Sequence, residues 1–563
     1  MNLSRRPTLR RVTKPLVLAA LGAVALTAPM FGQQDVRSFI VQGRDLDSAR
    51  AEVLAVGGEI THELGIIASI GARLSEAQMQ ALEASGAVRR IYADARVETA
   101  KRLLSVAQEP VDADDPAADA TGHVTGVDAH RLHAEGILGA GVTVAVLDTG
   151  HFLFRALVHH EDRTARTLAH YNAIDDLEES IYSWADGSGH GTHVAGIILN
   201  RDLSADSDGY RGIAPEADWV VVRAFDENGQ GSYADVIRGI DWVVANKEVY
   251  AIGVLNLSFS APPRSHYWED PLNQAVMAAW EAGVAVVASA GNLGPDPMSV
   301  GVPGNVPYVI TAGAMTDGYT PADPTDDTLA SFSASGPTYE GFVKPELVAP
   351  GGHVISLMTG DSRIPKEYPE FHDGGEYFTM SGTSQSAAVV SGVAALMLQA
   401  DPSLSPDDVK CRLMASAQAA FAADGSAAYG ILQQGAGLVN AYEAVYSTET
   451  GCANRGLDVS ADLEGSAHYA GPVRGDADDN FYIAGPDGTL YSGSFLWSDS
   501  FLWSDSFLWS DSFLWSDSFL WSDSFLWSDS FLWSDSFLWS DSFLWSDALT
   551  ETTIGINVWV EEE

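Results

Sequence analysis

The sequence predicts an α/β protein built on a mostly parallel sheet with helices on both faces, a small α+β unit before it and a β-rich repetitive tract after it. Three observations predict this architecture. Buried-strand and helical patterns alternate from residue 123 to 447, a shorter βαββαβ pattern occupies residues 35–100, and a six-residue repeat fills residues 495–548. Because strands that alternate with helices usually pair in parallel, the largest segment should bury its sheet between two helical layers.

The first segment, 35–100, has the element order of a ferredoxin-like unit. Strands are expected at 38–42, 59–64, 66–74 and 88–97, and helices at 46–56 and from Ser75 to Ser85. Ser75 and Gln78 have the spacing of a capping box, which satisfies free N–H groups at the start of a helix. The acidic residues 101–122 then predict an exposed linker and processing region.

The second segment, 123–447, contains five apolar runs that predict buried strands at 142–147, 219–225, 254–259, 284–288 and 308–312. Helical patterns at 234–247, 272–282 and 384–399 separate or follow them. Functional residues of such folds gather at the carboxyl ends of the strands. A Gly- and Asp-rich connector, 448–494, leads to the repeats.

Composition excludes several classes of function. The 563 residues carry 31 Lys and Arg against 76 Asp and Glu, a net charge of -45, so a nucleic-acid binder or a polybasic membrane binder is not expected. A hydrophobic content of 46% is too high for a disordered acidic chain. Two cysteines cannot form a disulfide framework; Cys411 and Cys452 suit either one bridge in an oxidising compartment or two unrelated buried thiols.

The N-terminal residues 1–34 predict a signal peptide. They hold five basic residues and no acidic one, and an apolar run at 15–28 follows the basic residues. That run is too short to span a bilayer comfortably, although a membrane anchor is the alternative. No later run reaches 18 apolar residues, so no transmembrane segment is expected, and the chain should be secreted or located at the cell surface.

Three motifs in the second segment carry reactive side chains. Asp148 ends an apolar strand in an Asp-Thr-Gly turn, which would also fit half of an aspartic-protease dyad in a homodimer. His190 lies in a Gly-His-Gly-Thr-His run that suits a tightly packed helix; zinc binding with His193 is the alternative, without a third matching ligand. Ser384 begins a helix of small residues, where an ordinary N-cap is the alternative role.

Together the motifs occur in the order Asp, His, Ser, and over residues 123–447 the chain resembles the subtilisin-like serine proteases, the subtilase family or peptidase S8. The resemblance implies Ser384 as nucleophile, His190 as general base and then acid, and Asp148 as the residue that orients the imidazole. It implies an oxyanion hole from the Asn292 side chain and the Ser384 backbone N–H. The implied activity is an endopeptidase that forms an acyl-enzyme on protein substrates without a cofactor.

The same resemblance assigns substrate contacts to a strand and to a pocket for the residue before the cut: Ser258, Phe259 and Ser260 in the strand, Ala290 and Gly291 in the wall, and Gly301 at the floor. Glycine at the floor predicts room for a large apolar side chain. Phe259 and Ser260 stand where the family usually has leucine and glycine.

Calcium is common in the family, so the resemblance implies a structural calcium ion as the candidate metal. Asp206 and Asp208 are candidate ligands, and the run that begins at Asp476 starts like an EF-hand loop, but neither region supplies a complete ligand set. Residues 35–100 also look like the inhibitory propeptide of the family. This implies a self-inhibited precursor that is cut within residues 98–122.

The C-terminal tract holds nine copies of Phe-Leu-Trp-Ser-Asp-Ser without a gap, the last of them ending in Ala548, and is followed by an acidic tail, 549–563. An even period puts Phe, Trp and Asp on one face of an extended strand, which predicts a β-solenoid; an unstructured, aggregation-prone tail is the alternative. Such a tract suits surface attachment, self-association or glycan contact. A rival hypothesis for the whole chain is therefore a catalytically silent binding or self-assembling protein.

Overall fold

The computed structural model of the protein describes residues 36–94, 122–183, 186–204, 209–318, 327–421, 427–475, 481–484, 490–492 and 555–556. The predicted signal peptide, the repeats and residues 101–121 of the predicted linker lie outside these ranges. Asp206, Asp208 and Asp476 also lie outside them. Among the described residues, no helix combines the length and hydropathy needed to cross a membrane.

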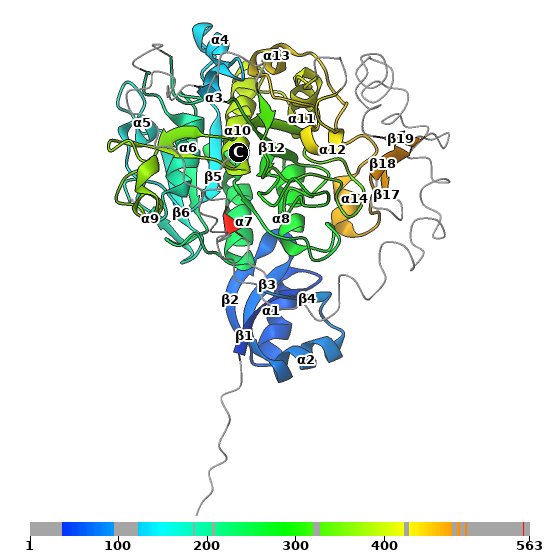
Figure 1. Cartoon of the computed structure of the whole chain (residues 1–563). Helices are drawn as coiled ribbons and strands as arrows, with labels where there is room; N and C mark the ends of the chain where they lie inside the picture. The colour runs from blue at the N-terminus through cyan, green and yellow to red at the C-terminus, as the bar shows by residue number, and fades with distance from the viewer. Residues whose placement is uncertain are drawn as a thin grey trace, which may run out of the picture.

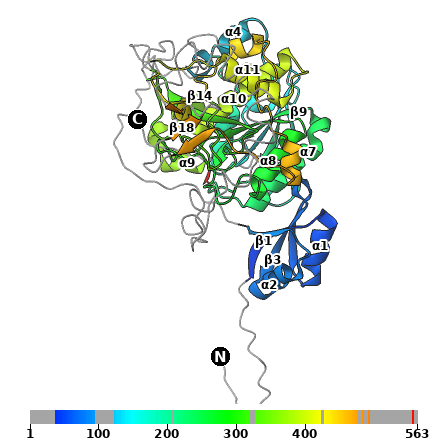
Figure 2. The same cartoon turned by 90° about the vertical axis from the view of Figure 1, so that its right-hand side faces the viewer.

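The N-terminal residues form a separate small unit in the predicted βαββαβ order, drawn in blue in Figures 1 and 2. Its antiparallel sheet has the strand order β2-β3-β1-β4. Its elements are β1 (Val36–Gln42), α1 (Leu46–Ala55), β2 (Glu59–Leu64), the 3₁₀ turn η1 (Gly65–Ile67), β3 (Ser69–Ser75), α2 (Glu76–Ser85) and β4 (Arg90–Ala93). The capping box is confirmed, because Ser75 accepts from the backbone N–H of Gln78 and the Gln78 side chain accepts from that of Ser75.

The main body is organised around a large sheet with the order β13-β12-β11-β9-β5-β8-β6-β7, to which β14 adds beside β12. Its strands are β5 (Thr143–Asp148), β6 (Thr167–Asn172), β7 (Leu177–Glu179), β8 (Asp218–Arg223), β9 (Ile252–Leu257), β11 (Ala285–Ser289), β12 (Ile310–Thr316), β13 (Thr328–Leu329) and β14 (Leu347–Pro350). All pairs are parallel except β6 with β7 and β12 with β13. The prediction of a mostly parallel sheet is confirmed.

Two pairs of long helices cover this sheet. α6 (His190–Leu199) packs against α10 (Thr383–Ala400), and α7 (Tyr233–Tyr250) packs against α8 (Pro271–Glu281). Residues 383–397 of α10 are all buried, and they contact β9, β11, β12 and β14. The small side chains in this helix allow such close packing against the central strands.

Shorter elements complete the body. They are α3 (Gly122–Thr125), α4 (Ala129–Ala134), α5 (Arg155–Val158), β10 (Phe259–Ser260), β15 (Val354–Leu357), α9 (Arg363–Glu367), η2 (Pro369–Phe371), β16 (Tyr377–Met380), α11 (Pro406–Ser416), α12 (Ile431–Gln434), α13 (Ala441–Tyr446), α14 (Val459–Glu464), β17 (Val473–Gly475), β18 (Phe481–Ala484), β19 (Leu490–Ser492) and β20 (Gly555–Ile556).

The expected strand at 254–259 is divided in the structure. β9 ends at Leu257, and Phe259 and Ser260 form β10, which pairs antiparallel with β20. The break at Ser258 has a physical reason, because the Ser258 carbonyl and hydroxyl both bond to Ser384 instead of to a neighbouring strand. The chain therefore leaves the large sheet beside the start of α10.

A disulfide joins Cys411, in α11, to Cys452, with 5.2 Å between their Cα atoms. It closes a loop between positions 41 apart. In the chain-entropy account, such a loop stabilises the fold by about 4 kcal/mol. We expect the double substitution Cys411→Ala, Cys452→Ala in a Ser384→Ala background to lower the free energy of unfolding by about that amount, measured by denaturant titration. An equal loss in fully reduced parent protein is the matched control; unchanged unfolding in both would contradict a stabilising bridge.

Candidate active site

Asp148 and His190 form a buried polar pair. Asp148 is the last residue of β5 and is 1% exposed; His190 is the first residue of α6 and is fully buried. The Nδ1 atom of His190 lies 2.7 Å from Asp148 Oδ1, which also accepts from the Thr149 backbone N–H at 2.7 Å. Since the carboxylate can only accept, Nδ1 carries the proton in this pair. The other ring nitrogen, Nε2, is then the one that can take a proton from a nucleophile.

Asp186, which the sequence motifs did not single out, holds the two sides of this pair together. Its Oδ1 accepts from the Thr149 hydroxyl at 2.8 Å and from the Gly189 N–H at 2.7 Å. Its Oδ2 accepts from the backbone and the hydroxyl of Thr192 at 2.8 and 2.5 Å. One buried carboxylate thus ties the turn after β5 to the first turn of α6. The only signal in the sequence was an Asp four positions before the histidine.

Ser384 is the second residue of α10 and does not cap the helix. The N-cap is Gly382, so the N-cap interpretation does not describe Ser384. The Ser384 hydroxyl donates to the Ser258 carbonyl at 3.0 Å, and the Ser258 hydroxyl donates to the Ser384 carbonyl at 3.0 Å. This reciprocal pair holds Ser384 against the strand that was expected to bind substrate.

Asn292 contacts the first residue of α10, Thr383. Its Oδ1 accepts from the Thr383 backbone N–H at 3.0 Å and from the Thr383 hydroxyl at 2.9 Å. The Thr383 hydroxyl in turn accepts from the Gly291 N–H at 3.1 Å. Because both contacts use the carbonyl oxygen, the orientation of the amide is defined and its Nδ2 group remains as a donor for another group.

The starts of α6 and α10 lie in one region. Gln385, next to Ser384, has its Nε2 atom 3.4 Å from Nδ1 of His193, which lies three residues beyond His190. Nε2 of His193 is 3.0 Å from the Phe378 carbonyl, and burial lowers the pKa of His193 to about 3. His193 is therefore a neutral packing residue, held by the protein at both nitrogens. The zinc alternative required His193 as a ligand.

The expected substrate strand is the edge strand β10. Ser258 precedes it, and Phe259 is fully buried against Phe225, with 5.3 Å between the ring centroids. β10 pairs antiparallel with β20, Phe259 opposite Ile556 and Ser260 opposite Gly555. This edge therefore accepts an extended chain as a β-strand.

The expected pocket walls come together beside β10, but the space between them is not empty. A Cβ atom added to Gly301 would lie 2.0 Å from the Ser260 hydroxyl, and one added to Gly291 would lie 2.8 Å from it. Ala290, fully buried, accepts from the Gly301 N–H at 3.0 Å. The two glycines thus make room for Ser260, where the sequence predicted room for a large substrate side chain.

Comparison with known proteins gives the relationships of this chain. The subtilase family of peptidases matches residues 139–437. Serine protease AprX of Bacillus subtilis is 40% identical over 279 residues, which are 49% of this chain and 60% of that protein. An alkaline protease of Alkalihalobacillus alcalophilus is 31% identical over 413 residues, which are 73% of this chain and 88% of that protein.

A solved structure is also similar. Fervidolysin from Fervidobacterium pennivorans, described as a keratinolytic enzyme related to subtilisin, matches with a TM-score of 0.54 and 24% identity over 74% of this chain and 62% of that one. The match to AprX likewise spans about three fifths of the relative's length. The fold is therefore subtilisin-like, and the chain belongs to the subtilase family.

Proposed function

We propose that the protein is a serine endopeptidase in which Ser384 is the nucleophile, His190 the general base and acid, and Asp148 the residue that orients the imidazole. The bond of 2.7 Å between Asp148 and His190 Nδ1 is the observation that carries the proposal. It places a proton on Nδ1, so that Nε2 is the nitrogen available to accept a proton from the serine, and it orients the imidazole.

The proposed reaction has two halves. The Ser384 oxygen attacks the peptide carbonyl carbon while its proton moves to His190 Nε2, and Asp148 stabilises the imidazolium that forms. The oxyanion is bound by Asn292 Nδ2 and the Ser384 backbone N–H. The intermediate then expels the amine, which takes the proton from His190 and leaves an acyl-enzyme. Water, deprotonated by His190, hydrolyses the ester and restores Ser384.

The chemistry uses only these side chains and water, so it requires no cofactor. Among the described residues, no group of three or more His, Cys, Asp or Glu side chains could hold a metal ion. The calcium candidates named from the sequence lie outside those residues, and calcium, if bound, would have a structural role.

A direct test uses a serine-directed phosphonylating reagent on the purified enzyme with casein as substrate. We expect complete loss of hydrolysis and one phosphonyl group per chain on Ser384, located by mass spectrometry. Modification elsewhere with activity retained would contradict the assignment. The rival, a silent binding protein, predicts no casein hydrolysis before treatment.

We further propose that the N-terminal unit is an inhibitory propeptide and that the enzyme is exported by residues 1–34 as a self-inhibited precursor. The support for the propeptide role is that the N-terminal unit packs closely against the main body. Leu64 and Ile67 belong to the same apolar core as the main body, and the Gln42 side chain donates to Gln274 of α8 at 2.8 Å. A precursor cut between the two units would release a free protease.

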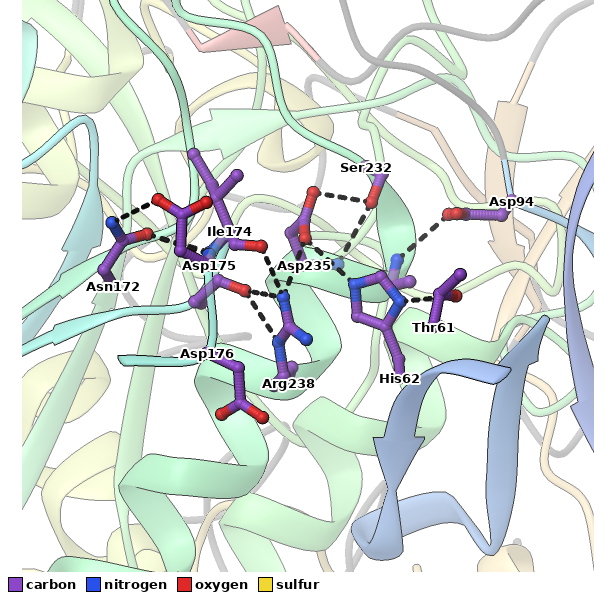
Figure 3. Close-up of polar contacts among 12 residues, drawn as sticks. Thr61, His62, Asp94, Asn172, Ile174, Asp175, Asp176, Ser232, Asp235 and Arg238 are labelled. Atoms are coloured by element: carbon purple, nitrogen blue, oxygen red, sulfur yellow. Dashed lines mark hydrogen bonds and ion pairs between the residues drawn. The ribbon is translucent and has the colours of Figure 1, made fainter. Parts of the chain in front are cut away.

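The interface also contains half-buried carboxyl groups. In Figure 3, His62 of β2 reaches Asp235 of α7 at 3.0 Å, and Asp235 is also 3.3 Å from Arg238. Asp94, just after β4, accepts from the Ala234 N–H of α7 at 3.1 Å and from Ser38. Burial raises the pKa of Asp94 above its ordinary value of 3.8, and the nearby Asp235 raises it further.

Asp241 of α7 is a second half-buried carboxyl at this interface whose pKa is raised. It accepts hydrogen bonds from the backbone of Gly65 and Ile66, and burial raises its pKa. A carboxyl whose pKa is raised in the docked state binds its proton more tightly there than in water. Its contribution to docking is therefore complete below the ordinary pKa of 3.8 and is lost as the pH rises through the raised value.

We therefore expect the N-terminal unit of the Ser384→Ala precursor to be held more weakly as the pH rises from 4 towards 8. Hydrogen exchange of its amides, corrected for the intrinsic pH dependence, measures this opening. The matched variants Asp94→Asn and Asp241→Asn keep the shape of the side chain but cannot ionise, so each should flatten the profile. Protection that is independent of pH in the parent would contradict the interpretation.

The repeat tract remains a separate hypothesis. We propose that residues 495–548, which lie outside the described ranges, serve surface attachment or self-association, because identical aromatic side chains recur every sixth residue. The protein would thus be a secreted or cell-surface enzyme whose substrates are proteins and peptides. Its large net negative charge disfavours nucleic-acid partners.

A further inference from the structure

The side chain of Ser260 lies between Gly291 in the wall and Gly301 at the floor of the expected pocket. A Cβ atom built on Gly301 would be 2.0 Å from the Ser260 hydroxyl oxygen, far inside any allowed contact. A Cβ atom built on Gly291 would be 2.8 Å from the same oxygen and 3.4 Å from the Ser260 Cβ. One hydroxymethyl group therefore contacts the wall and the floor at once.

The wall and the floor of the pocket cannot move apart easily. Beyond Ser260, the chain is tied to the floor segment by two reciprocal bonds, from Ala261 N–H to the Val302 carbonyl at 2.9 Å and from Val302 N–H to the Ala261 carbonyl at 2.7 Å. The Gly301 N–H is held by the Ala290 carbonyl on the wall. Strand, floor and wall thus form one hydrogen-bonded frame of fixed width.

The space behind the wall is also filled. Ala290, Val300 and Ala334 form a buried apolar cluster. Ala334 lies 3.7 Å from a Cβ atom built on Gly291. A bulky substrate side chain could not gain room by displacing this cluster without disrupting close packing.

We infer that Ser260 closes the pocket for the residue before the cut, so that the enzyme selects small residues such as Gly, Ala or Ser at that position and rejects large aromatic ones. This inference rests on the proposed function and deepens it by naming the substrate class. The aromatic ring of a substrate side chain would need the space between wall and floor that the Ser260 hydroxymethyl group occupies. Pockets that differ by one small group discriminate between substrates by about 10- to 200-fold.

Ser260 acts on specificity through the volume of its side chain. Two substitutions that remove its side-chain atoms stepwise therefore measure the effect of the hydroxyl and of the Cβ atom separately. Ser260→Ala removes the hydroxyl that contacts both glycines and retains the Cβ. Ser260→Gly removes both and gives the pocket the residue that the family usually has there. Preference for a large residue should rise in the order Ser, Ala, Gly.

The experiment measures kcat/KM for two blocked tetrapeptide p-nitroanilides that differ only in Ala or Phe before the scissile bond. We expect the parent to prefer Ala, and the Phe-to-Ala ratio of Ser260→Gly to exceed that of the parent by at least about tenfold. Ser265→Gly, a half-buried serine on the following segment, is the matched control and should keep the parental ratio. Each preparation is titrated with the phosphonylating reagent so that only folded, reactive enzyme is counted.

Two results would overturn this inference but not the proposed function. One is a parent that is labelled by the reagent and prefers Phe; the other is a Phe-to-Ala ratio in Ser260→Gly within twofold of the parental ratio. A parent that cuts neither peptide and is not labelled would instead overturn the proposed function. The two failures are therefore distinguishable in one set of measurements.

Discussion

Ser384→Ala is expected to abolish peptide hydrolysis and to leave the chain as an uncut precursor. The substitution removes the oxygen proposed to attack the substrate, and in subtilisin itself loss of the nucleophile lowers kcat by a factor of the order of 10⁶. Folding should survive, because residues 383–397 of α10 are all buried and the substitution leaves the bond from the Thr383 N–H to Asn292 at the start of the helix in place. Casein hydrolysis and the size of the chain on a denaturing gel measure the two effects.

Ser386→Ala provides the matched control for this experiment. Ser386 is also fully buried in α10, and its hydroxyl also donates to a backbone carbonyl, that of Ala349, at 3.1 Å. The control should hydrolyse casein and process its N-terminus. Processing that proceeds normally in Ser384→Ala would show that another protease makes the cut, and casein hydrolysis by that variant would refute the nucleophile assignment.

The central elements of the fold could be predicted from the sequence because their side chains are apolar on all sides. β5 is buried at every one of its six positions, and its expected range, 142–147, agrees with the observed Thr143–Asp148 to within one residue. β6 and β7 were missed, because they contain polar residues such as His170 and Glu179 whose contacts are supplied only in the folded chain. The hydrophobic pattern of a sequence shows which strands are apolar, but it does not show which polar side chains will pair in the folded chain.

The candidate site also contains residues that the sequence revealed and residues that it did not. Asp148, His190 and Ser384 stand in recognisable local motifs at element ends, so their residue types and their order along the chain were enough to single them out. Asp186 stands in no such motif, and its importance comes from four bonds to groups on both sides of the site. The position of Ser260 was equally hidden, because a sequence shows which residue replaces glycine but not where its side chain points.

Replacing Asn292 by Ala is expected to lower kcat by about 10² to 10³ with a much smaller effect on KM. In the proposed reaction the amide donor acts where negative charge develops on the substrate oxygen, so its loss should raise the barrier more than it weakens substrate binding. Steady-state kinetics on a peptide anilide, with active enzyme counted by titration, separate kcat from KM.

Asn292→Asp isolates the donor from the structural role of this side chain. Asn292 Oδ1 accepts from both Thr383 groups, and a carboxylate keeps that acceptor while it replaces the Nδ2 donor by an oxygen. If the donor is what matters, Asp should be at least as inactive as Ala, since it also brings a negative charge to the oxyanion. If the side chain only anchors the start of α10, Asp should retain near-parental kcat while Ala does not. That second pattern would remove Asn292 from the oxyanion hole and leave the Ser384 backbone N–H as the one assigned donor.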